Sequence, residues 1–105
     1  MGNSEDYWTD EETGIDISER LTTPKMFKVI LHNDDYTSME FVIEVLESIF
    51  NKQSVDATAI MLDVHKKGSG ICGVYTLDIA ATKVAQVKAL AEKNQFPLKC
   101  SYEEE

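Results

Sequence analysis

Residues Met26 to Phe41 read MFKVILHNDDYTSMEF. Its first seven residues are rich in β-favouring side chains, which predicts a strand over 26–32. Asn33-Asp34-Asp35 is typical of a turn, because Asn and Asp side chains bond to their own backbone. An amphipathic helix begins within a few residues. The sequence therefore predicts a strand, a turn and a helix, with three short polar side chains at the end of the strand.

Apolar residues with helical spacing occur in three separate segments after this turn. Thr37 and Glu40 fit a capping box at the start of the first helix. Ser54 and Thr76 are suitable N-caps for a second and a third helix, and Gly68 is suited to end the second. The predicted helices cover 38–50, 54–67 and 77–94.

Two further segments favour strands, 70–75 and 98–102. Gly73 inside the first of them indicates a β-bulge or a close approach of another backbone. The predicted order is then β-α-α-β-α-β, without any hairpin. We therefore expect an α+β fold, a small sandwich of three helices on one face of a three-stranded, mainly antiparallel sheet.

Negative charge gathers at the two ends of the chain. Residues 1–23 hold seven acids and one base, and 103–105 are three further acids, whereas 24–102 hold nine acids and nine bases. The first segment has no sustained apolar period, so burial cannot offset the entropy of ordering it. We expect 1–23 to be a mobile acidic arm, either a solubilising tail or a docking motif around Tyr7 and Trp8. Residues 24–105 form the predicted core domain.

Composition argues against several classes of protein. Clustered Lys and Arg are absent, which argues against nucleic acid as a partner. No apolar run approaches the roughly 18 residues of a membrane span. We therefore expect a soluble, cytoplasmic protein that does not meet a membrane, and we expect it to be a monomer. A chain of 105 residues cannot enclose a large cofactor, and none is expected. Cys72 and Cys100 lie in apolar strand-like segments and are expected to be buried thiols rather than zinc ligands.

The polar junction at 33–35 allows several interpretations. A turn in which side-chain oxygens satisfy backbone N–H groups is the simplest. A metal site would need Asp34, Asp35 and a histidine such as His65, which is a sparse set of ligands. A catalytic carboxylate pair lacks an accompanying nucleophile or phosphate loop. The remaining interpretation is recognition of a cation beside an apolar side chain.

His65 gives this last interpretation its chemistry. It continues the helical face of Met61, at the end of the second predicted helix. If Asn33, Asp34 and His65 converge, they offer three acceptors, and an ammonium group presents three donors. Nearby apolar residues would then receive the side chain next to that ammonium, as in the first residue of a peptide; the candidates are Met39, Val42, Met61 and Leu98.

Several separated segments together resemble one known family, the ClpS adaptors, bacterial proteins that deliver substrates to the ClpA-ClpP protease. The resemblance covers about 24–102, and its motifs occur in the family's order and spacing. It implies an α+β sandwich similar to the C-terminal domain of the ribosomal stalk protein. It also likens the acidic arm to the family's N-terminal extension. The matching segments are Phe27–Val42, Met61–His65, Ile71–Val74 and Thr82–Val84.

The resemblance implies a role for each matching residue. Members recognise N-degrons, proteins whose first residue is Leu, Phe, Tyr or Trp. Asn33, Asp34 and His65 would contact the α-amino group and first peptide unit, flanked by Asp35 and Thr37. The side-chain pocket would be walled by Met39, Val42, Met61, Val64 and Leu98, with Met39 as a gate against β-branched residues. The surface for the N-terminal domain of ClpA would include Tyr75, Thr76, Asp78 and Lys83.

Two positions depart from the family pattern, and two other classes of function compete with it. Ser38 stands where many relatives have Pro, and Asp78 stands where one relative has Glu. One rival is a scaffold of the ribosomal-stalk type that binds a partner without a peptide pocket. The other is a small metal-dependent enzyme that uses Asp34, Asp35 and His65. The adaptor interpretation implies no catalysis and no metal.

Overall fold

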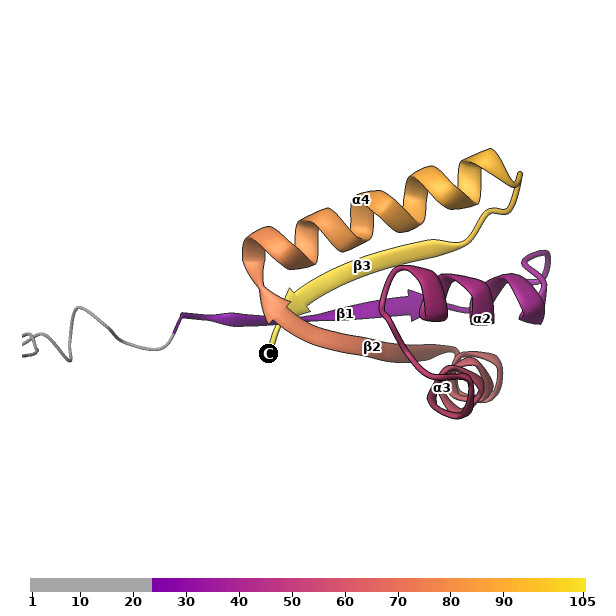
Figure 1. The fold of residues 1–105 in the computed structure, drawn as a ribbon, viewed down its shortest axis with the longest axis horizontal. Coiled ribbons are helices and arrows are strands. Elements are labelled where there is room, and N and C mark those ends of the chain that lie inside the picture. The colour runs from indigo at the N-terminus through magenta and orange to yellow at the C-terminus, as the bar shows by residue number, and fades with distance from the viewer. Residues whose placement is uncertain (1–23) are drawn as a thin grey trace, which may run out of the picture.

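The computed structural model describes residues 24–105, and the predicted arm over 1–23 lies outside the described residues. The elements follow the predicted order β-α-α-β-α-β (Figure 1). Their bounds are β1 (Met26–His32), α2 (Met39–Ser48), α3 (Ser54–Lys67), β2 (Ser69–Thr76), α4 (Leu77–Lys93) and β3 (Lys99–Glu104).

The sheet has β1 at its centre, in the order β2-β1-β3, and both pairings are antiparallel. Its register shifts between Val29 and Ile30, where β2 accommodates one extra residue. Gly73 lies beside this irregularity, and a Cβ built there would approach the Tyr75 hydroxyl to 2.5 Å. The bulge predicted for Gly73 is therefore present, but its close neighbour is the Tyr75 side chain rather than another backbone. The α+β architecture is confirmed.

The core lies on one face of the sheet. Val29 and Leu31 of β1 are fully buried and alternate with half-buried neighbours, as expected for a sheet covered on one side. All three helices add side chains to the same cluster, and each fully buried Val or Leu contributes roughly 1.5–3 kcal/mol. Residues from α2, α3 and α4 in this cluster include Val45, Leu46, Ala57, Val64, Ala80 and Val87.

A glycine allows α3 to pack closely on β2. A Cβ at Gly70 would lie 2.9 Å from the Val64 Cγ2 and 3.2 Å from the Ile60 carbonyl oxygen. Only glycine fits such a contact without displacing the helix. α3 therefore lies close against the sheet edge formed by β2.

The structure corrects several predicted boundaries. α2 covers Met39–Ser48 rather than 38–50, and its N-cap is Ser38 rather than Thr37. Gln53, not Ser54, is the N-cap of α3, and neither Gln53 nor Thr76 makes a side-chain cap bond. β2 is longer than 70–75, and β3 begins at Lys99 and takes in part of the acidic C-terminal segment.

Candidate functional site

The end of β1 and the end of α3 are joined by a backbone hydrogen bond. The Asn33 N–H donates to the Gly68 carbonyl at 2.9 Å. Gly68 adopts a left-handed conformation with φ of 92° and closes α3 by donating its N–H to the Val64 carbonyl at 3.0 Å. The glycine that the sequence identified as a helix end thus brings His65, in the last turn, beside the polar junction.

Asp34 organises the junction itself. One carboxylate oxygen accepts from the backbone N–H groups of Tyr36 at 2.8 Å and Thr37 at 2.7 Å, and the other accepts from the Thr37 hydroxyl at 2.7 Å. Partial burial alone would raise the pKa of the Asp34 carboxyl. The hydrogen bonds from Thr37 and Tyr36 outweigh it, and the pKa is lowered. Asp34 is therefore a fixed, ionised carboxylate.

The start of α2 follows from that turn. Because Asp34 holds Thr37, the next hydroxyl takes over the cap, and the Ser38 Oγ accepts from the Phe41 N–H at 3.1 Å. This fixes where the first turn of α2 begins. Met39 and Val42, one turn apart, consequently share the side of the helix that lies over the junction.

A hollow of about 330 Å³ lies between this junction, α2 and α3. It brings together every residue predicted for recognition of a peptide N-terminus and its side chain, with one exception. The exception is Leu98, which lines a separate cavity beside β3. Ser38 lines the hollow and was not among the predicted residues. The lining residues are Asn33, Asp34, Asp35, Thr37, Ser38, Met39, Val42, Met61, Val64 and His65.

Polar and apolar groups are separated within the hollow. Val42, Met61 and Val64 are buried, with exposed fractions of 6%, 7% and 2%, and form an apolar floor. Met39 is 45% exposed and can reach over the opening. Exposed polar residues, among them Asn33 and His65, form the rim. The arrangement suits a ligand with one apolar side chain and one polar, cationic end.

The residues predicted to meet a partner lie at the junction of β2 and α4. The Lys83 ammonium donates to the Ile49 carbonyl at 2.6 Å and lies 5.8 Å from the centre of the Tyr75 ring. Tyr75 and Lys83 are therefore in one cluster. Thr76 is the N-cap of α4, and Asp78 is exposed in its first turn.

Sequence reasoning missed the structural role of Lys83. Its partner carbonyl belongs to Ile49, 34 residues away, at the C-cap of α2. No local pattern reports a contact over that separation. A weak signal does exist, because α2 carries no basic residue in its last turn and its carbonyl groups need a donor from elsewhere.

Two findings bear on the classes of function considered from the sequence. Within residues 24–105, no group of three or more His, Cys, Asp or Glu side chains is arranged to hold a metal ion. No helix in that same part of the chain is long and apolar enough to cross a membrane.

Cys72 and Cys100 are free thiols, and burial raises the pKa of both.

Comparison with known proteins gives a consistent result. Residues 22–101 match the family described as "ATP-dependent Clp protease adaptor protein ClpS". ATP-dependent Clp protease adapter proteins ClpS from Syntrophus aciditrophicus and Clostridium acetobutylicum are 54% and 57% identical to this chain, over 90% and 87% of it and 89% and 90% of their own lengths.

A solved structure supports the same assignment. The structure of Agrobacterium tumefaciens ClpS2 bound to L-phenylalaninamide matches with a TM-score of 0.76 and 38% identity. The match covers 79% of this chain and all of that one. Fold, family match and relatives agree, and the chain therefore belongs to the ClpS family of ATP-dependent Clp protease adaptors, non-catalytic proteins that present substrates to the protease.

Proposed function

We propose that the hollow beside Met39 binds the first residue of other proteins when it is Leu, Phe, Tyr or Trp, and that the chain delivers those proteins to the ClpA-ClpP protease. The observation that carries this proposal is the polar rim beside an apolar floor. Only the first residue of a chain carries an ammonium group on the same carbon atom as its side chain. Such a residue matches both parts of the hollow.

The ammonium would be held by Asn33, Asp34 and His65. An amide oxygen, a carboxylate and a neutral imidazole nitrogen provide three acceptors for its three donors. Asp34 already accepts three hydrogen bonds, and a carboxylate has about four acceptor positions, so one remains for the ligand or a bridging water. Asp35 and Thr37 flank this group in the lining of the hollow.

The side chain would enter over Val42, Met61 and Val64, with Met39 at the opening. A volume of about 330 Å³ is at the small end of ligand pockets, which favours a single side chain. Further support comes from the ligand of the Agrobacterium relative, because phenylalaninamide combines a free amino group with an aromatic side chain.

The test is a binding titration with three labelled peptides that differ only at their first residue. A Phe-initiated peptide should bind, and a Ser-initiated one should not. Acetylating the Phe-initiated peptide removes its charge and leaves the acceptors unpaired, which should cost about 2–5 kcal/mol, or at least about 30-fold in Kd. Undiminished binding of the acetylated peptide would refute the assignment of the acceptors.

A pair of variants separates the site from general charge effects. Asp34→Asn removes the negative charge at the rim and should weaken binding of the Phe-initiated peptide. Asp63→Asn removes the same charge from the exposed side of α3, where Asp63 pairs with Lys67 at 3.5 Å, and should leave binding unchanged. Equal affinities for the two variants would contradict the role of Asp34.

A second surface of the chain would bind the N-terminal domain of ClpA. Its contact residues would be Tyr75, Thr76, Asp78 and Lys83. Support comes from the neighbours of Asp78, because Leu77 and Ile79 are 46% and 47% exposed. Exposed apolar side chains around a charge are typical of a protein-binding surface. We expect the chain to act as a monomer in the cytoplasm, because the cytoplasm supplies the ATP that an ATP-dependent protease consumes.

Asp78→Lys tests this surface independently of the hollow. It should weaken capture of the isolated ClpA N-terminal domain, while the Kd for the Phe-initiated peptide stays that of the wild type. Asp63→Lys is the matched control, since it makes the same charge change on another helix. Loss of capture in both variants, or in neither, would argue against Asp78 as a contact.

A further inference from the structure

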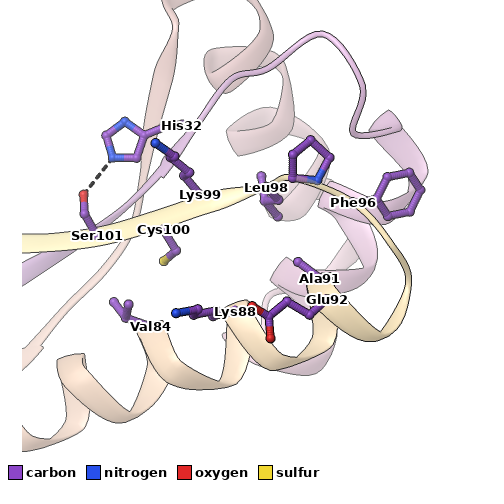
Figure 2. Close-up of a pocket in the computed structure, with 11 residues that line it drawn as sticks. His32, Val84, Lys88, Ala91, Glu92, Phe96, Leu98, Lys99, Cys100 and Ser101 are labelled. Carbon is purple, nitrogen blue, oxygen red and sulfur yellow. Dashed lines mark hydrogen bonds between the residues drawn. The ribbon is translucent and has the colours of Figure 1, made fainter.

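A second hollow, of about 500 Å³, lies between α4 and the start of β3 and shares no residue with the first (Figure 2). We call it the α4/β3 cleft. Side chains of α4 point across it toward β3, and Cys100 points back toward the helix. Its lining residues are His32, Val84, Lys88, Ala91, Glu92, Phe96, Pro97, Leu98, Lys99, Cys100 and Ser101.

The cleft has apolar walls and a basic rim. Ala91 and Leu98 are buried, and burial raises the pKa of the Cys100 thiol to about 12, so it lies in the wall as a neutral, apolar group. Lys88 and Lys99 are exposed at the rim, opposed by the single acid Glu92. An occupant with an aromatic side chain and several acids fits this combination.

The cleft also borders an open sheet edge. In the order β2-β1-β3, β3 pairs with β1 on one side, and no strand of residues 24–105 pairs with its other side. The backbone at the start of β3, along 99–101 beside the cleft, therefore offers hydrogen-bonding groups to an added extended segment. A strand edge next to a helix, with a cavity for a side chain, is a known arrangement for binding extended peptides.

We propose that residues 5–12 of the same chain, EDYWTDEE, dock in the α4/β3 cleft. This segment has five acids and no base, with Tyr7 and Trp8 at its centre. Its charge and its two aromatic rings complement the basic rim and the apolar walls. The interaction is separate from recognition of a peptide N-terminus, and it does not depend on the function proposed above.

The length of chain available permits this contact. Fifteen residues lie between Trp8 and Pro24, which is about 50 Å when extended, whereas the six residues of β3 span about 20 Å. The connection to β1 also raises the local concentration of the segment to about the millimolar range. Weak contacts in the cleft are therefore sufficient to hold it.

Trp8 is the only tryptophan of the chain, so its fluorescence in the full-length protein reports on this contact directly. The reference is a free peptide of residues 1–23. Docking predicts emission at shorter wavelength than the peptide and several-fold weaker quenching by acrylamide. Lys88→Glu combined with Lys99→Glu should return both values to those of the peptide, with circular dichroism confirming that the fold is retained.

A matched double variant, Lys66→Glu with Lys67→Glu, makes the same charge change at the end of α3 and should keep Trp8 protected. Wild-type emission and quenching equal to those of the free peptide would overturn the proposal. So would equal release of Trp8 in both double variants. Protection that rises with protein concentration would assign the cleft to a second copy and would also overturn docking within one chain.

Discussion

Lys83 joins the end of α2 to α4, and replacing it tests how much that connection contributes. Its ammonium donates to the Ile49 carbonyl at 2.6 Å and lies 5.9 and 5.8 Å from the ring centres of Phe50 and Tyr75. A cation at the C-terminus of a helix also interacts favourably with the helix dipole. Lys83→Met keeps most of the aliphatic stem and removes only the charge and its donors.

The expected loss follows from these contacts. A hydrogen bond to a charged group contributes about 1.5–3 kcal/mol, and the lower part of that range applies because this bond is only part-buried. Cation–π contacts at such sites add about 0.5–1 kcal/mol. Since neighbouring terms are not additive, we expect a loss of about 2 kcal/mol. For a domain of this size the melting temperature should fall by about 8–16 °C.

Urea unfolding followed by circular dichroism measures this difference. Lys93→Met is the control, because Lys93 is an exposed lysine on the same helix for which no ion pair is found among the described residues. It should change the free energy of unfolding by less than about 1 kcal/mol, which allows for its position in the last turn. If Lys83→Met is as stable as Lys93→Met, the Ile49 contact is not a stabilising interaction and the reasoning is wrong.

Three further predictions concern the hollow and the packing beneath it. Because hydrogen bonds lower the pKa of Asp34 in the folded state, its ionised form stabilises the fold above about pH 4 and this contribution is lost as pH falls through the lowered value. The stability deficit of Asp34→Asn should therefore be largest at pH 7 and shrink at pH 3 in urea unfolding; a constant deficit would contradict it. Gly70→Ala places a Cβ 2.9 Å from Val64 and should cost about 1–3 kcal/mol in the same assay, whereas a neutral effect would mean that α3 can shift freely. Met39→Ala should admit peptides that begin with Ile or Val in the binding titration, and unchanged selectivity would remove Met39 as a gate.

The order of elements could be predicted because each is marked by its own local pattern. β1 matches its predicted bounds, and Gly68 ends α3 as expected. The error at the start of α2 arose because Thr37 and Ser38 are both good caps. The choice between them depends on the Asp34 carboxylate, which captures Thr37 through a side-chain contact that composition does not report.

Other errors came from long-range pairing. β3 continues to Glu104, beyond the predicted 98–102, because β1 offers Glu103 a strand partner and Lys28 pairs with its carboxylate at 3.4 Å. Leu98, which was predicted to wall the hollow beside Met39, precedes β3 and lines the α4/β3 cleft. A periodicity along the chain identifies apolar residues, and it cannot say which of two cavities they line.

The hydrogen bond between the Asn33 N–H and the Gly68 carbonyl affects how fast a ligand can bind to the hollow and leave it. It ties the rim of the hollow to the central strand and to a capped helix, so these backbone segments have little freedom to lose when a ligand arrives. Association is then governed by diffusion and orientation rather than by closure of a loop. A preformed rim also lacks a built-in means of opening. The rate of release is then set by the contacts of the bound chain itself, and a force that pulls on that chain would raise it.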